Sequence, residues 1–351
     1  MEDMLEMPPE LREEAHLMEL ESMGYTIVHE AIPPQLLKKI KLAHNQAIER
    51  IRSSKPEADW SWESDNPGVC DYWRLYQLDP VFEELLTLPS IFNIIKRAFK
   101  EGRGRPATDE GIRLMHEMGQ HLPAKTPGGQ AWHRDGMNKK AENKYPNLRC
   151  TFTLNDLPSN GGGTIVLPGS HRPGFDGNYF HVLNNTKEKV KYEKPRPGRS
   201  SPPYDRSSVQ PRKMPNAVTF SGKAGSCMIN WVSIWHTRPT NESNVDRDVI
   251  WQIFRTARSS LGNGRRQHHQ TKNYLSHIRN KNNNYSPEFI KLFDDSETID
   301  GTRWDFEGLS KEEIERTTAA EPLFPSGRPD IMEEEDDETN NYNRRENNAK
   351  L

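Results

Sequence analysis

The chain is short of the residues that mark secreted, disulfide-bonded and membrane-spanning proteins. Its 351 residues include only three cysteines, none of them in a C-x-x-C pair. An odd and widely spaced set argues against a disulfide framework and against a cysteine-ligated metal, so we interpret the thiols as reduced core residues. No apolar run approaches the ~18 residues of a membrane-spanning helix. The acidic N-terminus also lacks the apolar segment of a secretory signal.

The chain also lacks a large net charge of either sign. The formal net charge is −3, which argues against a nucleic-acid partner. Hydrophobic residues make up 33% of the chain, enough at this length to build one sizeable core with appendages. We therefore predict a single domain at 15–330, a flexible N-terminus at 1–14 and a disordered acidic tail at 331–351.

Two histidines and an aspartate form a pattern that predicts a metal centre. His133 and Asp135 stand two residues apart, and His236 follows far downstream, after a strand-like apolar run. Residues i and i+2 of a strand point to the same side, so one metal ion can contact both members of the pair. Two imidazoles and one carboxylate can hold Fe(II) by one face, which leaves positions open for a co-substrate and O2. The triplet alone also arises by chance in a chain with 12 histidines and 51 acidic residues, so its surroundings decide.

Three segments surround this pattern: 132–135 (WHRD), the glycine-rich block at 160–171, and His236 followed by Arg247. Together they resemble the phytanoyl-CoA dioxygenase family of Fe(II)/2-oxoglutarate-dependent oxygenases. The likeness covers roughly residues 15 to 260. It implies a mainly β fold with flanking helices, in which N-terminal helices brace a double-stranded β-helix (a cupin-like jelly roll).

The resemblance also assigns roles to single residues. It implies that the iron ligands, which are also the catalytic residues, are His133, Asp135 and His236. It implies that Arg247 forms an ion pair with the distal carboxylate of 2-oxoglutarate, a role that suits the planar guanidinium. Without the upstream histidine, a surface arginine would be the simpler interpretation. Further candidate contacts to the co-substrate are Thr237, Phe152 and Lys125, the last of which is otherwise a solvated loop residue.

Two positions bear on the reaction type and on the co-substrate contacts. Two residues after the distal histidine, the family often carries a small hydroxyl residue, whereas this chain has Arg238. The carboxylate ligand, which related halogenases replace by a small residue, is present as Asp135. The resemblance therefore implies hydroxylation rather than halogenation.

The predicted activity is that of a 2-oxoglutarate-dependent dioxygenase. It hydroxylates an aliphatic C–H of an organic substrate, consumes O2 and releases succinate and CO2, with ascorbate as a candidate reductant. An acyl-CoA is one substrate class that the resemblance implies. The alternative is a small specialised metabolite that is hydroxylated, desaturated or cyclised. From another class, a jelly-roll protein that binds a ligand without turnover also stays open.

Periodicity predicts the elements around this centre. We expect a helical part at 15–105, a jelly-roll core at 106–260 with a lid-like insert at 176–215, and a helical extension at 261–330. Strands are predicted at 24–28 and 112–118, and an apolar stripe predicts a helix that begins near Pro34. The glycines at 161–163 predict a tight β-turn rather than a phosphate cradle, because no helix follows them. Four aromatic residues are expected in a loop, as packing anchors or as a substrate wall: Trp60, Trp62, Tyr72 and Trp73.

Two segments point to partners. The insert is rich in proline and basic residues, so we expect either a lid that meets an anionic or CoA-linked small-molecule substrate, or a solvated loop. The chain ends in Ala349-Lys350-Leu351, a conservative variant of the Ser-Lys-Leu peroxisomal address. We therefore expect the peroxisomal import receptor as a partner and a peroxisomal location, with a cytoplasmic location as the alternative.

Overall fold

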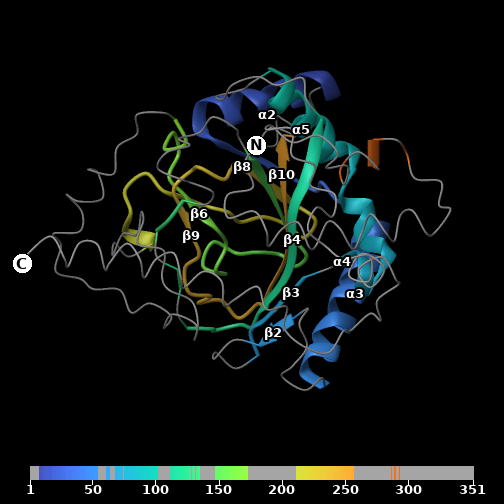
Figure 1. Ribbon diagram of the computed structural model, residues 1–351. Coiled ribbons are helices and arrows are strands. Elements are labelled where there is room, and N and C mark those ends of the chain that lie inside the picture. The colour runs from blue at the N-terminus through green and yellow to red at the C-terminus, as the bar shows by residue number, and fades with distance from the viewer. Residues whose placement is uncertain are drawn as a thin grey trace, which may run out of the picture.

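The computed structural model shows two β-sheets and a layer of helices (Figure 1). It describes residues 8–53, 61–63, 68–73, 75–101, 111–127, 129–130, 132–134, 147–172 and 211–256, together with 286, 288–289 and 292. The predicted acidic tail and most of the predicted insert and C-terminal extension lie outside these residues, so those assignments stay predictions.

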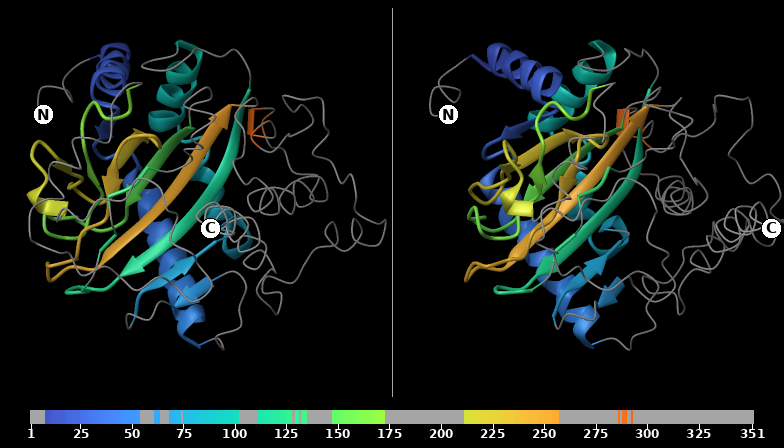
Figure 2. Two further views of the ribbon diagram at one scale, coloured as in Figure 1. Left: turned by 60° about the vertical axis from the view of Figure 1, so that its left-hand side comes forward. Right: turned by 90° about the vertical axis from the view of Figure 1, so that its left-hand side faces the viewer.

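The larger sheet has seven strands in the order β1-β8-β5-β10-β4-β3-β2. Its strands are β1 (Tyr25–Val28), β2 (Ser61–Glu63), β3 (Cys70–Tyr72), β4 (Ile112–Leu122), β5 (Asn147–Thr153), β8 (Cys227–Trp231) and β10 (Arg247–Thr256). Each neighbouring pair is antiparallel. Figure 2 shows the two longest strands, β10 and β4, running side by side across the molecule.

The smaller sheet has three strands in the order β7-β6-β9, again antiparallel. Its strands are β6 (Ile165–Val166), β7 (Val218–Thr219) and β9 (His236–Thr237). In Figure 1, β10 and β4 lie between this sheet on one side and the helices α3 and α4 on the other. Antiparallel sheets joined by crossovers are the arrangement of a jelly roll, so the predicted fold class is confirmed.

In the described residues the elements with assigned bounds include the helices α2 (Pro9–Met23), α3 (Pro34–Ser53), α4 (Leu75–Leu78) and α5 (Pro89–Glu101), with short 3-10 turns η1 (Pro80–Leu85) and η2 (Pro211–Lys213). The predicted apolar stripe of α3 is buried at Ile40, Ile48 and Ile51. Helix α2 begins at Pro9, inside the stretch predicted to be flexible, and Arg97 of α5 pairs with its Glu14 at 2.7 Å. Every helix in the described segments falls short of the apolar length that a bilayer crossing needs.

The main core lies between these helices and one face of the larger sheet. Residues of α3 and α5 pack there against alternate residues of the strands, among them Cys150, Ile250 and Phe254. All three cysteines are free and buried, which confirms the prediction of reduced core residues. The apolar faces of these helices therefore serve to pack the core, as expected for amphipathic helices.

The aromatic stretch around residue 72 is paired rather than looped, so the loop prediction is wrong there. Strands β2 and β3 pair with each other, and β3 adds to β4 through Tyr72 opposite Gly119. Tyr72 is fully buried in the main core, in agreement with its interpretation as a packing anchor. Short strands of this kind depend on a partner far away in sequence, and local periodicity does not show them.

Side-chain alternation along β10 separates two environments. Ile250 and Phe254 belong to the main core on the helix side. Trp251 and Ile253 pack instead with Met115, on the side of the larger sheet that faces away from the helices. Because side chains of a strand alternate between faces, Arg247 lies on the same face as Trp251. We call this side the barrel face of the larger sheet.

Candidate functional site

The structure brings His133 and His236 together. The two residues form an antiparallel bridge, in which His133 N donates to His236 O at 3.0 Å and His236 N donates to His133 O at 2.9 Å. The centroids of the two rings lie 4.3 Å apart. His236 is 2% exposed, and His133 is half-buried. Asp135, the third predicted ligand, lies outside the described residues.

The ring of His236 is held in one tautomer. Its Nδ1 lies 2.9 Å from Ile234 O, and a carbonyl only accepts, so the proton sits on Nδ1. Nε2 therefore carries the lone pair, and Arg149 Nη1, which only donates, lies 3.0 Å from it. A buried, neutral imidazole whose orientation is fixed through its second nitrogen is the form that binds a divalent metal. These residues thus fit the metal that the sequence pattern predicts.

The residue before each histidine is a tryptophan, and both tryptophans pack on one side of the His133–His236 bridge. Trp132 and Trp235 are almost fully buried and belong to one apolar cluster with Ile165 and Leu167. Strand β6, at the centre of the smaller sheet, supplies Ile165 to this cluster. It pairs directly with β9, the strand that begins with His236. The tryptophans fix the backbone on either side of the bridge and keep water from one wall of the site.

Arg247 is buried at 4% exposure and opens β10. Its Nη1 donates to Gln120 Oε1, and Gln120 Nε2 donates to Asp71 Oδ1 at 2.7 Å, which turns the amide oxygen toward the guanidinium. Burial and the charge of Arg238 lower the pKa of Arg247 to about 9, although Asp71 and Asp248 counteract the shift. The positive charge of this guanidinium is therefore only partly balanced, and Arg247 can bind a further anion.

Donor capacity is left on the same guanidinium. The Nε of Arg247 is buried and has no hydrogen-bond partner among the described residues. An arginine fork binds a carboxylate through two parallel N–H donors, so a dicarboxylate such as 2-oxoglutarate fits this residue. The fit agrees with the role that the sequence pattern predicts for Arg247.

The sequence reasoning gave no role to Arg149, although a signal was present. Arg149 is a single charged residue in an otherwise uncharged strand run, Asn147–Thr153. Its guanidinium Cζ lies 5.3 Å from the centroid of the Trp251 ring, so it lies on the barrel face. That ring in turn stacks on His116 at 4.8 Å between centroids. Arg149 thereby links His236 to the face of β10 that also carries Arg247.

The other three predicted co-substrate contacts each have other contacts in the structure. Phe152 is fully buried in the main core, on the opposite side of β5 from Arg149, because residues 149 and 152 differ by an odd number of positions. Thr237 Oγ1 donates to Gln130 O at 2.6 Å and so anchors a loop. Lys125 is exposed, and its Nζ donates to Glu242 O at 2.7 Å. The roles of Thr237 and Lys125 thus stay predictions, whereas Phe152 lies on the face of β5 that points away from Arg149.

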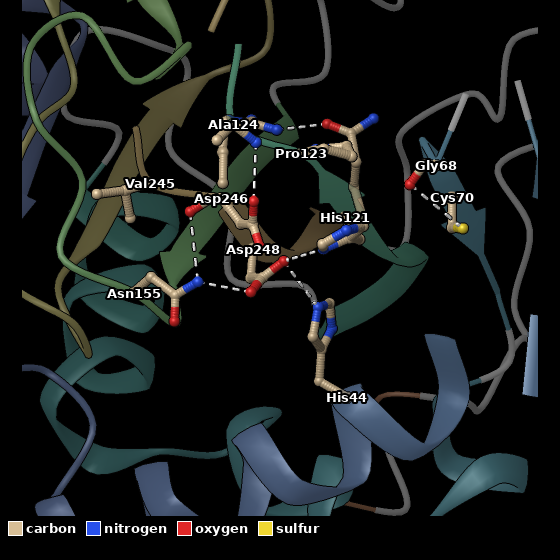
Figure 3. Close-up of polar contacts among 12 residues, drawn as sticks. His44, Gly68, Cys70, His121, Pro123, Ala124, Asn155, Val245, Asp246 and Asp248 are labelled. Atoms are coloured by element: carbon tan, nitrogen blue, oxygen red, sulfur yellow. Dashed lines mark hydrogen bonds and ion pairs between the residues drawn. The ribbon is translucent and has the colours of Figure 1, made fainter. Parts of the chain in front are cut away.

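A second histidine–aspartate group lies on the helix side of the larger sheet. Its members are His44 of α3, His121 of β4 and Asp248 of β10, and their ligand atoms lie within 4.8 Å of one another (Figure 3). It shares no residue with the pair at His133 and His236. The sequence reasoning missed this group because its members are far apart in the chain and follow no motif.

An antiparallel jelly roll with paired imidazoles and a buried guanidinium defines a class of proteins, the 2-oxoglutarate-dependent non-haem iron enzymes. The chain belongs to the family described as Phytanoyl-CoA dioxygenase (PhyH), which matches residues 20–249. It is therefore an oxidoreductase of that class, with iron and 2-oxoglutarate as its cofactors.

Several solved structures are similar to the chain. The non-haem, α-ketoglutarate-dependent carbocyclase SnoK from nogalamycin biosynthesis is 15% identical, with a TM-score of 0.50 over 77% of this chain and 92% of that chain. AviO1 from Streptomyces viridochromogenes Tue57 is 15% identical (TM-score 0.48, 69% and 94% covered). HygX from Streptomyces hygroscopicus, solved with nickel, 2-oxoglutarate and hygromycin B, is 13% identical (TM-score 0.47, 68% and 86% covered). No curated protein matches the chain.

Proposed function

We propose that the chain hydroxylates an aliphatic C–H bond of an organic substrate, for which an acyl-CoA is one candidate, with His133, Asp135 and His236 as the iron ligands. The observation that supports this best is the bridge between His133 and His236, with Arg149 connecting it to the face of Arg247. The part of Asp135 rests on its spacing from His133 and on the family resemblance.

The protein's own contribution is orientation and charge. Fe(II) bound here, together with 2-oxoglutarate and O2, supplies the oxidation of a C–H bond and yields succinate and CO2. Ile234 O holds the proton of His236 on Nδ1, so the lone pair that would bind the metal is on Nε2, where Arg149 Nη1 now donates at 3.0 Å. Arg247, held by Gln120, offers its remaining donors to the distal carboxylate of 2-oxoglutarate. Burial makes both interactions stronger than they would be in water.

The charge of the site suits a dianion. Arg238 and Arg247 are both almost fully buried, and Arg238 lowers the pKa of Arg247. Two buried cations close to one another repel, and a ligand with two carboxylates relieves that repulsion. Arg238 thus contributes a positive charge at the position where the family often has a small hydroxyl residue.

Turnover without a substrate tests the proposal. We expect the full chain with Fe(II), ascorbate and 2-oxoglutarate to form succinate, and we expect His133→Ala and His236→Ala to abolish it. His29→Ala, a half-buried histidine away from the bridge, is the matched control and keeps the activity. Wild-type turnover in either of the first two variants would refute the ligand assignment. Binding of 2-oxoglutarate without any succinate would favour the alternative of a ligand-binding protein.

The substrate class needs its own experiment. The family name refers to an acyl-CoA, so acyl-CoA esters are the first compounds to test. We expect the true substrate class to accelerate succinate formation above the uncoupled rate, and mass spectrometry to show one added oxygen in the product. If only free small metabolites accelerate it, the alternative of a small specialised metabolite as the substrate holds. A product that has lost two hydrogens would show desaturation or cyclisation in place of hydroxylation. The C-terminal tripeptide lies outside the described residues, and a peroxisomal location stays our proposal from sequence.

A further inference from the structure

Directly behind Arg247, on the helix side of the larger sheet, lies a closed polar cluster centred on Asp248. His121 Nδ1 lies 2.6 Å from Asp248 Oδ1, and His44 Nε2 lies 3.2 Å from the same oxygen. Asn155 Nδ2 donates to the other oxygen, Oδ2, at 2.6 Å. Figure 3 shows these side chains converging on the carboxylate from a helix, a strand and a loop. His44, His121 and Asp248 are all buried.

The protons of this cluster argue for hydrogen bonds rather than a metal ion. Arg52 Nη2 lies 3.1 Å from His121 Nε2, and a guanidinium only donates, so Nε2 accepts and the ring proton sits on Nδ1. That proton points at Asp248, in the place where a metal would need the lone pair. Tyr72 OH meets the second nitrogen of His44, Nδ1, at 2.6 Å. The residue types of a facial triad are present, but the His121 nitrogen that faces Asp248 carries a proton rather than a lone pair.

The carboxylate stays charged inside this cluster. Burial opposes its ionisation, but the contacts from His121 and His44 outweigh burial and hold the pKa of Asp248 well below its usual range. A buried carboxylate with several donors is a strong and directional anchor, and removal of one partner leaves an uncompensated group.

The anchor sits at the first residues of β10. Asp248 pairs with His121 and Arg247 pairs with Leu122 across β4. The backbone of Asp248 is also held, since Leu154 N donates to its carbonyl at 2.8 Å. Consecutive residues of a strand point to opposite faces, so whatever fixes the direction of Asp248 also fixes the direction of Arg247.

We propose that the cluster of His44, His121 and Asp248 is a positioning device for Arg247: it sets the affinity for 2-oxoglutarate from the opposite face of the sheet, without touching the co-substrate. The inference rests on the proposed role of Arg247. It assigns a function to a group of buried side chains that lies outside the predicted iron site. It also gives a role to two histidines and a carboxylate that are buried beside the apolar main core.

Two pairs of variants test the proposal in the full chain. We expect Asp248→Asn to weaken 2-oxoglutarate binding about tenfold, measured as Kd by anaerobic calorimetry with Mn(II) and as KM in uncoupled turnover. We expect kcat at saturating 2-oxoglutarate to change less than about twofold. Asp156→Asn, which breaks only the exposed pair with Lys223, is the matched control with unchanged constants.

Variants at His121 provide the second pair. His121→Leu removes the donor to Asp248, whereas His121→Asn keeps an N–H close to the Nδ1 position. We expect the leucine variant to weaken 2-oxoglutarate binding and the asparagine variant to restore most of it. Equal effects of both variants would overturn the proposal, as would unchanged Kd values in folded Asp248→Asn and His121→Leu.

A double-mutant cycle separates positioning from general loss of structure. In an Arg247→Ala background, Asp248→Asn should change the Kd for 2-oxoglutarate no further, because its effect acts through the missing guanidinium. Additive effects would overturn the inference. If Arg247→Ala alone leaves the Kd unchanged, the proposed role of Arg247 fails instead. If elemental analysis finds a second equivalent of metal that His44→Leu removes, the cluster is a metal site and the hydrogen-bonded account is wrong.

Discussion

Arg247 and Asp248 are consecutive in the chain, yet their side chains lie on opposite faces of the larger sheet. Arg247 meets Gln120 on the barrel face, and Asp248 meets His44 of α3 on the helix side. Strand alternation thus divides two tasks between neighbouring residues, one that offers charge to a ligand and one that fixes the strand to the helical layer. Four further predictions follow from contacts of this kind.

Gln120 should control the affinity for 2-oxoglutarate. Gln120→Leu removes the acceptor for Arg247 and the donor to Asp71 in one step, and leaves both charged groups without that partner. We expect the KM for 2-oxoglutarate to rise about tenfold in uncoupled turnover. Gln120→Glu should weaken binding as well, because its carboxylate competes with 2-oxoglutarate for Arg247. Gln35→Leu, at an exposed position of α3, is the control, and equal KM values for it and Gln120→Leu would contradict the assignment.

Arg149 should lower the metal affinity. Its guanidinium lies 3.0 Å from His236 Nε2, so a positive charge stands beside the atom that we propose as a ligand. Arg149→Met removes the charge and keeps much of the length of the side chain. We expect Mn(II) to bind about tenfold more tightly, as measured by electron paramagnetic resonance titration. Arg172→Met, at an exposed position, should bind Mn(II) as the wild type does. Weaker binding in Arg149→Met would show that Arg149 supports the metal instead.

His16 should make stability depend on pH. Burial, with smaller contributions from His29 and Arg12, lowers the pKa of His16 from 6.5 to about 4. Between these values the unfolded chain binds a proton that the folded chain excludes, so acidification favours unfolding. We expect the free energy of unfolding to fall by up to about 3 kcal/mol from pH 6.5 to pH 4 on this account.

His16→Asn keeps a donor toward Thr26, the partner of Nδ1 at 2.8 Å, and removes the titration. Urea unfolding at several pH values should therefore show a smaller loss of stability in this variant than in the wild type. If the two chains lose the same free energy over this range, His16 is not the group responsible.

Two glycines near the predicted turn should differ in their tolerance of alanine. A Cβ at Gly163 would lie 2.0 Å from the carbonyl oxygen of Phe220, and this backbone is paired with the strand that follows Gly163. Gly169 has open space around it but a φ of +78°. We expect Gly163→Ala to destabilise the protein by about 3 kcal/mol or more and Gly169→Ala by about 1 kcal/mol, measured by urea unfolding. The reverse order would contradict the close approach of Gly163 to Phe220.

The sequence alone determined the features that short-range patterns encode. The spacing of His133 and Asp135, with His236 downstream, led to the family, and the match over residues 20–249 bears this out. The apolar stripe of α3 and the strand at β4 followed from periodicity, because a buried face imposes its own repeat on the sequence. The free and buried state of the cysteines could be predicted from their number and their apolar neighbours.

Only the tertiary structure decided which side chains meet. It paired His133 with His236, and it placed Arg149 rather than Phe152 on the barrel face. It also assembled the cluster around Asp248 from three distant elements. The physical reason is strand register: a shift of one residue moves a side chain to the other face, and register is set by pairing between segments that lie far apart in the chain.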